Sequence, residues 1–75
     1  MSPRERTDDI LSVVETTRME RGMSVLRLVK STGIDCHTYY RWMRGETTPS
    51  LYNLCAVLEV LGLEIGITED GGNNA

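Results

Sequence analysis

The chain has 75 residues, of which 40% are apolar, and its formal net charge is −3. This length accommodates one small domain, and the apolar content argues against an intrinsically disordered chain. No apolar run is long enough for a membrane-spanning helix, and the charged N-terminal residues lack the apolar stretch of a signal peptide. We therefore expect a cytoplasmic protein with no membrane partner.

The charges are distributed unevenly along the chain. Residues 18–49 carry six arginine and lysine side chains against three carboxylates, a net charge of +3, whereas residues 1–17 and 50–75 carry −2 and −4. Uneven charge is common on the solvated surface of small proteins. It becomes informative only when the basic segment coincides with a recognisable structural unit.

The first two helices are predicted from their capping residues. Residues 2–5, Ser-Pro-Arg-Glu, form a capping box with proline at the first helical position. Apolar residues follow at helical spacing, and Gly22 ends this helix as a left-handed cap. Ser24 is the N-cap of a second, short helix, which ends near Thr32 because Gly33 permits a tight turn.

Two more helices follow the turn. Asp35 is the predicted N-cap of a third helix over residues 36–44. Thr48 is the predicted N-cap of a fourth helix with Pro49 at its first position, and Gly62 ends it after a broad apolar stripe.

Residues 63–68 change from a helical to an alternating pattern. Leu63, Ile65 and Ile67 alternate with small or polar residues, which predicts a strand with one apolar face. A lone strand leaves its backbone groups unpaired, and the chain offers no second strand. We therefore expect these residues to pair as an antiparallel ribbon with a second copy in a homodimer. Residues 69–75, with two glycines and two asparagines, predict a disordered tail.

The second and third helices, with the glycine-containing turn between them, have the layout of a helix-turn-helix unit over residues 24–44. The DNA major groove accepts one helix, and the preceding helix braces it against the DNA backbone. The sequence thus predicts a mainly α domain over residues 1–68, with four helices and a short C-terminal strand.

Several residues occur in a characteristic order over about residues 14–63. They are Arg18, Gly22-Met23-Ser24, Leu28-Val29, Gly33-Ile34, Tyr39-Tyr40-Arg41-Trp42, Arg44-Gly45, Pro49-Ser50-Leu51 and Leu61-Gly62. Their order and spacing resemble the Cro/C1-type (lambda-repressor-like, XRE) family of helix-turn-helix domains. The strand in place of that family's fifth helix resembles the HipB-type antitoxin regulators, whose C-terminal strands pair across a dimer.

The third helix has two different faces. Tyr39, Trp42 and Met43 follow the spacing i, i+3, i+4 and share the face expected in the core. On or near the outer face lie Cys36, His37, Tyr40, Arg41 and Arg44. The resemblance implies base contacts for the first four of these. Arg41 is the strongest candidate, because a guanidinium can donate to guanine O6 and N7 together.

Contacts with phosphate are predicted at both ends of the helix-turn-helix unit. Arg44 and Thr47 lie at the end of the third helix and in the loop after it, and Ser24 and Arg27 lie near the start of the second. Arginines at such positions are also compatible with ordinary solvated charges.

Three positions depart from the family pattern. Val25 replaces a glutamine that helps to contact the DNA backbone, and Tyr39 takes a position that is usually aliphatic, so its hydroxyl needs a partner. Met43 stands where a glutamate often pairs with the arginine that matches Arg18. Arg18 is therefore expected to reach solvent or another carboxylate.

Catalytic and metal sites are not predicted. His37, the only histidine, has no nucleophile motif near it, and the chain has no phosphate-binding loop. The side chains of Cys36 and His37 point about 100° apart on a helix, and no further pair completes a metal shell. Cys36 and Cys55 are expected to be reduced thiols. We expect no enzyme activity, no metal and no cofactor.

The sequence favours a transcriptional regulator that binds a palindromic operator in double-stranded DNA as a homodimer, and it favours a repressor of the prophage or antitoxin kind. In the antitoxin case, a toxin is an additional protein partner. The acidic ends, Val25 and Met43 keep an alternative open, namely a protein-interaction module that retains the fold without binding DNA.

Overall fold

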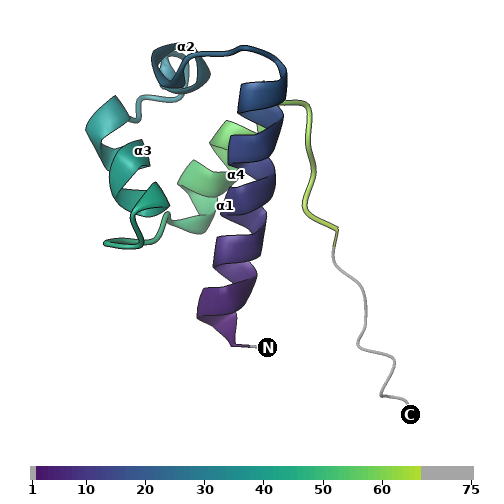
Figure 1. The fold of residues 1–75 in the computed structure, drawn as a ribbon, viewed down its shortest axis with the longest axis vertical. Helices are drawn as coiled ribbons and strands as arrows, with labels where there is room; N and C mark the ends of the chain where they lie inside the picture. The colour runs from purple at the N-terminus through teal and green to yellow at the C-terminus, as the bar shows by residue number, and fades with distance from the viewer. Residues whose placement is uncertain (1, 67–75) are drawn as a thin grey trace.

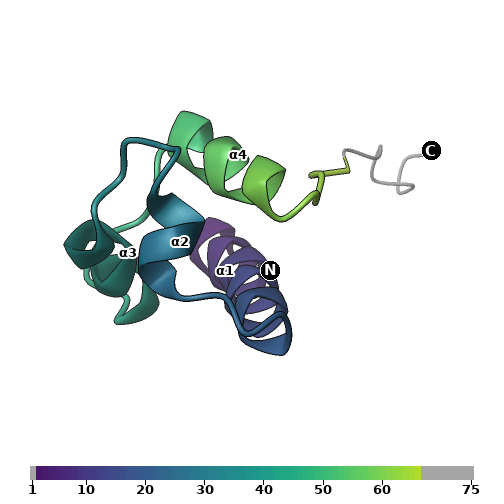
Figure 2. The ribbon, with the colours of Figure 1, turned by 90° about the horizontal axis from the view of Figure 1, so that it is seen from above.

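The computed structural model describes residues 2–66, which form four helices (Figure 1). They are α1 (Pro3–Glu20), α2 (Val25–Val29), α3 (Cys36–Met43) and α4 (Leu51–Val60). α2 contacts both α3 and α4. Figures 1 and 2 show α3 on one flank of the molecule and residues 63–66 on the opposite flank, with α1 and α4 between them.

The predicted starts of the first three helices are confirmed. Ser2 and Glu5 form the reciprocal capping box of α1, in which the Ser2 hydroxyl accepts the Glu5 N–H at 3.2 Å and the Glu5 carboxylate accepts the Ser2 N–H at 3.1 Å. The Ser24 and Asp35 side chains accept backbone N–H groups in the first turns of α2 and α3. Each such cap stabilises its helix by about 1 kcal/mol.

The predicted start of the fourth helix is wrong by two residues. Ser50, not Thr48, is the N-cap of α4, and its hydroxyl accepts the Asn53 N–H at 3.1 Å. Pro49 therefore precedes the helix instead of opening it. Thr48 and Ser50 both satisfy the local capping rules, and the structure uses the hydroxyl that reaches a backbone N–H of the helix.

The core receives apolar side chains from all four helices. Its buried members are Leu11, Val14, Val25, Leu28, Val29, Tyr39, Trp42, Leu54, Val57, Leu58 and Leu61. The predicted core face of α3 is confirmed, since Tyr39 and Trp42 are buried and Met43 packs partly buried against them. Val25 is itself a core residue, so an apolar side chain at this position contributes to packing.

The part of the predicted strand that the structure describes, residues 63–66, does not form a strand in the single chain. Residues 63–66 follow an irregular path after α4, and residues 2–66 contain no strand. A β-ladder needs a second strand, and the four helices and loops of the described residues supply none. Ile67, Thr68 and the predicted tail at residues 69–75 lie outside the described residues. No helix within residues 2–66 combines the length and apolar character needed to cross a membrane.

Candidate nucleic-acid interface

α3 has a buried face and an exposed face. The Tyr39 side chain is fully buried, and its ring centre lies 5.9 Å from that of Trp42 at a tilt of 58°. On the other side His37 and Tyr40 are exposed, and Arg41 retains 43% of its side-chain surface. The exposed side of this short helix thus presents an imidazole, a phenol and a guanidinium, which are groups able to contact base edges.

Cys36 lies closer to the core than the sequence indicated. It is partly buried and packs against the core, because it stands three residues before Tyr39 and shares that side of the helix. Of the four predicted base-contacting residues, the structure therefore places His37, Tyr40 and Arg41 on an accessible face and Cys36 at its edge.

A network of three side chains connects α1 to α3. Arg18 donates two hydrogen bonds to the Glu15 carboxylate, from Nε at 2.9 Å and from Nη2 at 2.7 Å. The Tyr39 hydroxyl donates to the same carboxylate at 2.8 Å. Arg18 also donates from Nη1 to the Met23 carbonyl at 2.6 Å. From the sequence, we expected Arg18 to reach solvent or another carboxylate. In the structure that partner is Glu15, which also satisfies the Tyr39 hydroxyl.

The network shifts the pKa values of Glu15 and Tyr39. The hydrogen bonds from Arg18 lower the pKa of Glu15 against the opposing effect of burial, and the bond from Tyr39 adds to the lowering. Burial raises the pKa of Tyr39, and its bond to Glu15 raises it further. At neutral pH Glu15 is therefore charged and Tyr39 remains a hydrogen-bond donor. These charge-assisted bonds hold the orientation of α3 relative to α1.

A second polar contact holds the C-terminal end of α3. Arg4, in the first turn of α1, donates from Nη2 to the Gly45 carbonyl at 2.6 Å. A cation is favourable here because the carbonyl groups at a helix end carry partial negative charge. Gly45 adopts φ 75°, and a Cβ at this residue would lie 3.2 Å from Arg4 Nη2. Sequence patterns did not identify this pair because its members are 41 residues apart.

The turn between α2 and α3 is held by the Thr32 hydroxyl. It donates to the Val29 carbonyl at 2.7 Å and accepts the Ile34 N–H at 3.1 Å. Gly33 has φ 82°, a left-handed conformation that L side chains rarely adopt. Ile34 packs against the core, as the sequence predicted. The two helices are therefore joined by a defined turn.

The predicted phosphate-binding residues occupy the two ends of this unit. Ser24 and Arg27 are exposed at the start of α2, and the Ser24 hydroxyl accepts the Arg27 N–H at 3.1 Å. Arg44 is exposed at the end of α3, and Thr47 is half-buried in the following loop. Of the predicted dimer residues on the opposite flank, Leu63 is half-buried and Ile65 is 37% exposed.

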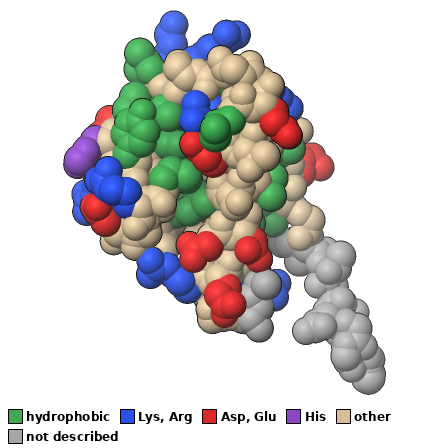
Figure 3. Space-filling model, viewed as in Figure 1, with side chains coloured by type: hydrophobic (Ala, Val, Ile, Leu, Met, Phe, Trp, Pro, Cys, Tyr) green, Lys and Arg blue, Asp and Glu red, His purple; other side chains and the backbone are tan. Residues whose placement is uncertain are grey.

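One carboxylate beside the arginines of α3 was not identified as a site residue from the sequence. Glu46 Oε2 lies 2.6 Å from Arg44 Nε, and Glu46 Oε1 lies 3.7 Å from Arg41 Nε. The bond from Arg44 is the main cause that lowers the pKa of Glu46, with smaller contributions from Arg41 and His37. Figure 3 shows the histidine beside blue and red side chains on the flank formed by α3.

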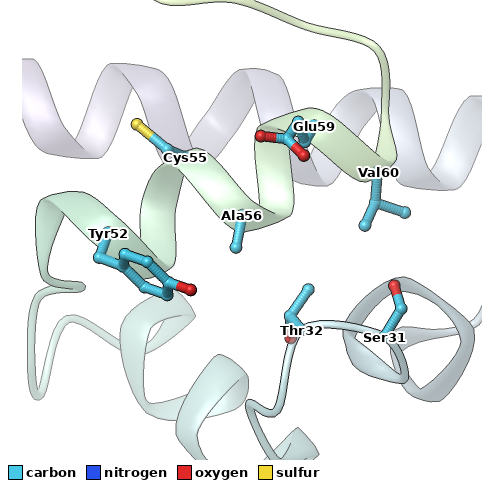
Figure 4. Close-up of a pocket in the computed structure, with 7 residues that line it drawn as sticks. All are labelled: Ser31, Thr32, Tyr52, Cys55, Ala56, Glu59 and Val60. Atoms are coloured by element: carbon cyan, nitrogen blue, oxygen red, sulfur yellow. The ribbon is translucent and has the colours of Figure 1, made fainter.

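A hollow lies behind the turn, between α4 and residues 31–32 (Figure 4). Ser31 and Thr32 face the side chains of α4 across it, including that of Tyr52. Tyr52 is 80% exposed and its neighbour Leu51 is 71% exposed, so the start of α4 presents two large side chains to solvent.

The exposed groups of the α3 flank suit the binding of anions and base edges. Within residues 2–66, no group of three His, Cys, Asp or Glu side chains is placed to hold a metal ion. Comparison with protein-family models, with curated proteins and with solved structures gives no match to this chain.

Proposed function

We propose that this protein is a sequence-specific, double-stranded DNA-binding regulator of transcription, in which α2 and α3 act as a helix-turn-helix unit. The observation that carries the proposal is that one face of α3 is fixed to the rest of the protein while the other face is exposed. Its inner face is held by the core and by the Tyr39–Glu15 bond, while His37, Tyr40 and Arg41 face outward. A major groove about 12 Å wide accepts such a helix.

Arg41 is the principal base-reading residue of the proposal. A guanidinium that donates to O6 and N7 of guanine discriminates against other bases by about 1–3 kcal/mol. The Arg41 contact with Glu46 involves Nε, so both terminal nitrogens remain available for a base edge.

Phosphate contacts at the two ends of the unit would set the position of α3 in the groove. Arg44 and Thr47 supply them after α3, and Ser24 and Arg27 supply them at the start of α2. Such contacts fix register and orientation but do not read sequence.

A homodimer is part of the proposal. On the flank opposite α3, an apolar groove lies between α1 and the segment after α4. It is lined by Ile10, Val13, Leu58, Leu63 and Ile65, with Arg6 and Glu64 at its polar margins. Pairing of residues 63–68 across a two-fold axis would cover this groove and direct the two α3 helices to half-sites about 34 Å apart. Binding of the dimer to a palindromic operator that overlaps a promoter would then block that promoter. Repression is therefore the proposed action.

A protein-interaction module without DNA binding is the second candidate. Two observations favour it, namely the partial neutralisation of Arg41 and Arg44 by Glu46 and the exposure of Leu51 and Tyr52. Salt distinguishes the two functions, because a complex with several phosphate contacts weakens steeply as salt rises, whereas an apolar protein interface does not.

Selection of bound duplexes from a random DNA pool tests the proposal. The wild-type chain is expected to enrich a palindrome. Arg41→Ala should weaken binding to it by about 5- to 150-fold and relax the preference at one base pair of each half-site. Lys30→Ala is the control, because it removes a cation from an exposed position outside the proposed interface. No enrichment at low salt would favour the protein-interaction module.

A further inference from the structure

We propose that Glu46 is a specificity-determining residue, which competes with phosphate for Arg44 and orients Arg41 for a base edge. Glu46 thereby weakens binding to nonspecific DNA more than binding to an operator. The inference rests on the proposed function, since it concerns how the same face distinguishes one duplex from another.

The position of Glu46 is set by the end of α3. The Glu46 N–H donates to the Arg41 carbonyl at 3.0 Å, and the Gly45 N–H donates to the Trp42 carbonyl at 3.1 Å. These two bonds form a Schellman motif, in which the second residue beyond the cap lies next to the third-last residue of the helix. An apolar pair commonly occupies these two positions. Here the pair is Glu46 and Arg41, so the helix end itself brings a carboxylate to the arginine.

The carboxylate engages the two arginines differently. Arg44 donates from Nε at 2.6 Å and from Nη2 at 3.4 Å, so one edge of its guanidinium is occupied. Arg41 approaches only with Nε, at 3.7 Å, and the two terminal nitrogens that would bond guanine remain free. Glu46 thus competes with phosphate at Arg44 and restricts the motion of Arg41 without blocking its base-reading atoms.

Charge explains why this arrangement favours specificity. Binding to nonspecific DNA is essentially electrostatic and follows the number of phosphates that the protein neutralises. Between Asp35 and Thr47 the two arginines are balanced by Asp35 and Glu46, so the recognition segment has little net attraction for a generic duplex. Base contacts do not depend on that balance, and ordering Arg41 beforehand reduces the entropy lost when it binds a base.

The test compares Glu46→Gln with the wild-type chain on the selected operator and on a scrambled duplex of equal length. Glutamine retains an acceptor for Arg44 but removes the charge. We expect affinity for the scrambled duplex to rise about three- to tenfold at low salt. The slope of log K against log salt should become steeper by about 0.9, because that is the value for one more phosphate contact. At the operator the same gain at Arg44 is offset by the loss of order in Arg41, so affinity for the operator should rise less or fall, and the ratio of the two affinities should fall at least about threefold.

Glu59→Gln is the matched control, because it removes one negative charge from an exposed position on α4. It should change affinity for the scrambled duplex less than twofold. Circular dichroism should show the same helix content for all three proteins. An equal change in both affinities, or none, with Glu46→Gln would overturn the inference while the proposed function stands. If neither the wild type nor Glu46→Gln binds any duplex at low salt, the proposed function is wrong and the inference fails with it.

Discussion

The two flanks of the molecule are built in different ways. On the α3 flank, side-chain hydrogen bonds from Arg4, Tyr39 and Arg44 hold the helix and its end in place. On the flank of residues 63–66, the only backbone bond among the described residues runs from the Leu63 N–H to the Leu58 carbonyl at 2.9 Å, and the adjoining surface is an apolar groove. One flank is fixed within the single chain, and the other has apolar surface available for a partner.

This difference suggests a division of tasks. Reading bases requires a helix whose orientation does not change, and polar bonds have the directionality to provide it. Association of two copies depends on buried apolar area more than on directional bonds, because burial of that area stabilises the dimer. The predictions below test each flank separately.

The largest expected effect is at the apolar flank. Ile65→Asp places a charge in the proposed interface of both copies, which should weaken the dimer by at least about 2 kcal/mol. Light scattering should then give a monomer at concentrations where the wild type is a dimer. Binding to a palindrome should weaken, while binding to a single half-site stays the same. Met19→Asp, at an exposed apolar residue of α1 that does not line the groove, is the control. A wild-type chain that is monomeric at all concentrations would contradict the proposed dimer.

The next largest effect is at the network that holds α3. Glu15→Gln removes the charged acceptor shared by Arg18 and Tyr39, and it should reduce the free energy of unfolding by about 1–3 kcal/mol at neutral pH. Chemical denaturation followed by circular dichroism measures this change. Glu20→Gln, an exposed substitution on the same helix, should change the stability by less than about 0.5 kcal/mol. Equal effects of the two substitutions would show that the network contributes nothing to stability.

The same network predicts a pH dependence. Because the folded chain lowers the pKa of Glu15, its contribution is present above the ordinary value of 4.5 and is lost as the pH falls through the lower folded value. The difference in stability between wild type and Glu15→Gln should therefore be constant from about pH 6 to 8 and shrink progressively below about pH 4.5. A difference that persists at pH 2 would contradict the role of the charge.

The smallest effect concerns the start of α4. Ser50→Ala removes the N-cap hydroxyl and should reduce the free energy of unfolding by about 1 kcal/mol. Thr48→Ala, at the position favoured by the sequence pattern, should change it by less than about 0.5 kcal/mol. Thermal unfolding of the two variants measures both changes, and the reverse order would place the helix start at Thr48.

Local patterns were sufficient for the starts of three helices because a cap involves residues three apart, whereas α2 ends at Val29, before the predicted end near Thr32. The capping box of Ser2 and Glu5 is one example, and the N-caps Ser24 and Asp35 are two more. The fourth helix shows the limit of such patterns. Thr48 followed by proline and Ser50 are both acceptable caps, and local rules do not rank them.

The sequence predicted the exposure of site residues where helical periodicity determines it. It did not predict the exposure where that depends on packing between distant segments. The spacing of Tyr39 and Trp42 correctly assigned the inner face of α3, and the exposure of His37 and Tyr40 follows from it. The partial burial of Cys36 did not follow, because the width of the buried stripe depends on what packs against it.

By itself, the sequence determined the helices, the glycine turns and the two faces of α3, because these depend on contacts within about one helical turn. Only the tertiary structure decided the polar contacts between residues far apart in the sequence. Glu15 receives Tyr39 from 24 residues away, and Gly45 receives Arg4 from 41 residues away. Glu46 lies close to Arg41 in sequence, but its contact depends on the backbone path of the helix end. Hydrogen bonds and ion pairs depend on the positions of individual atoms, and packing of the four helices sets those positions.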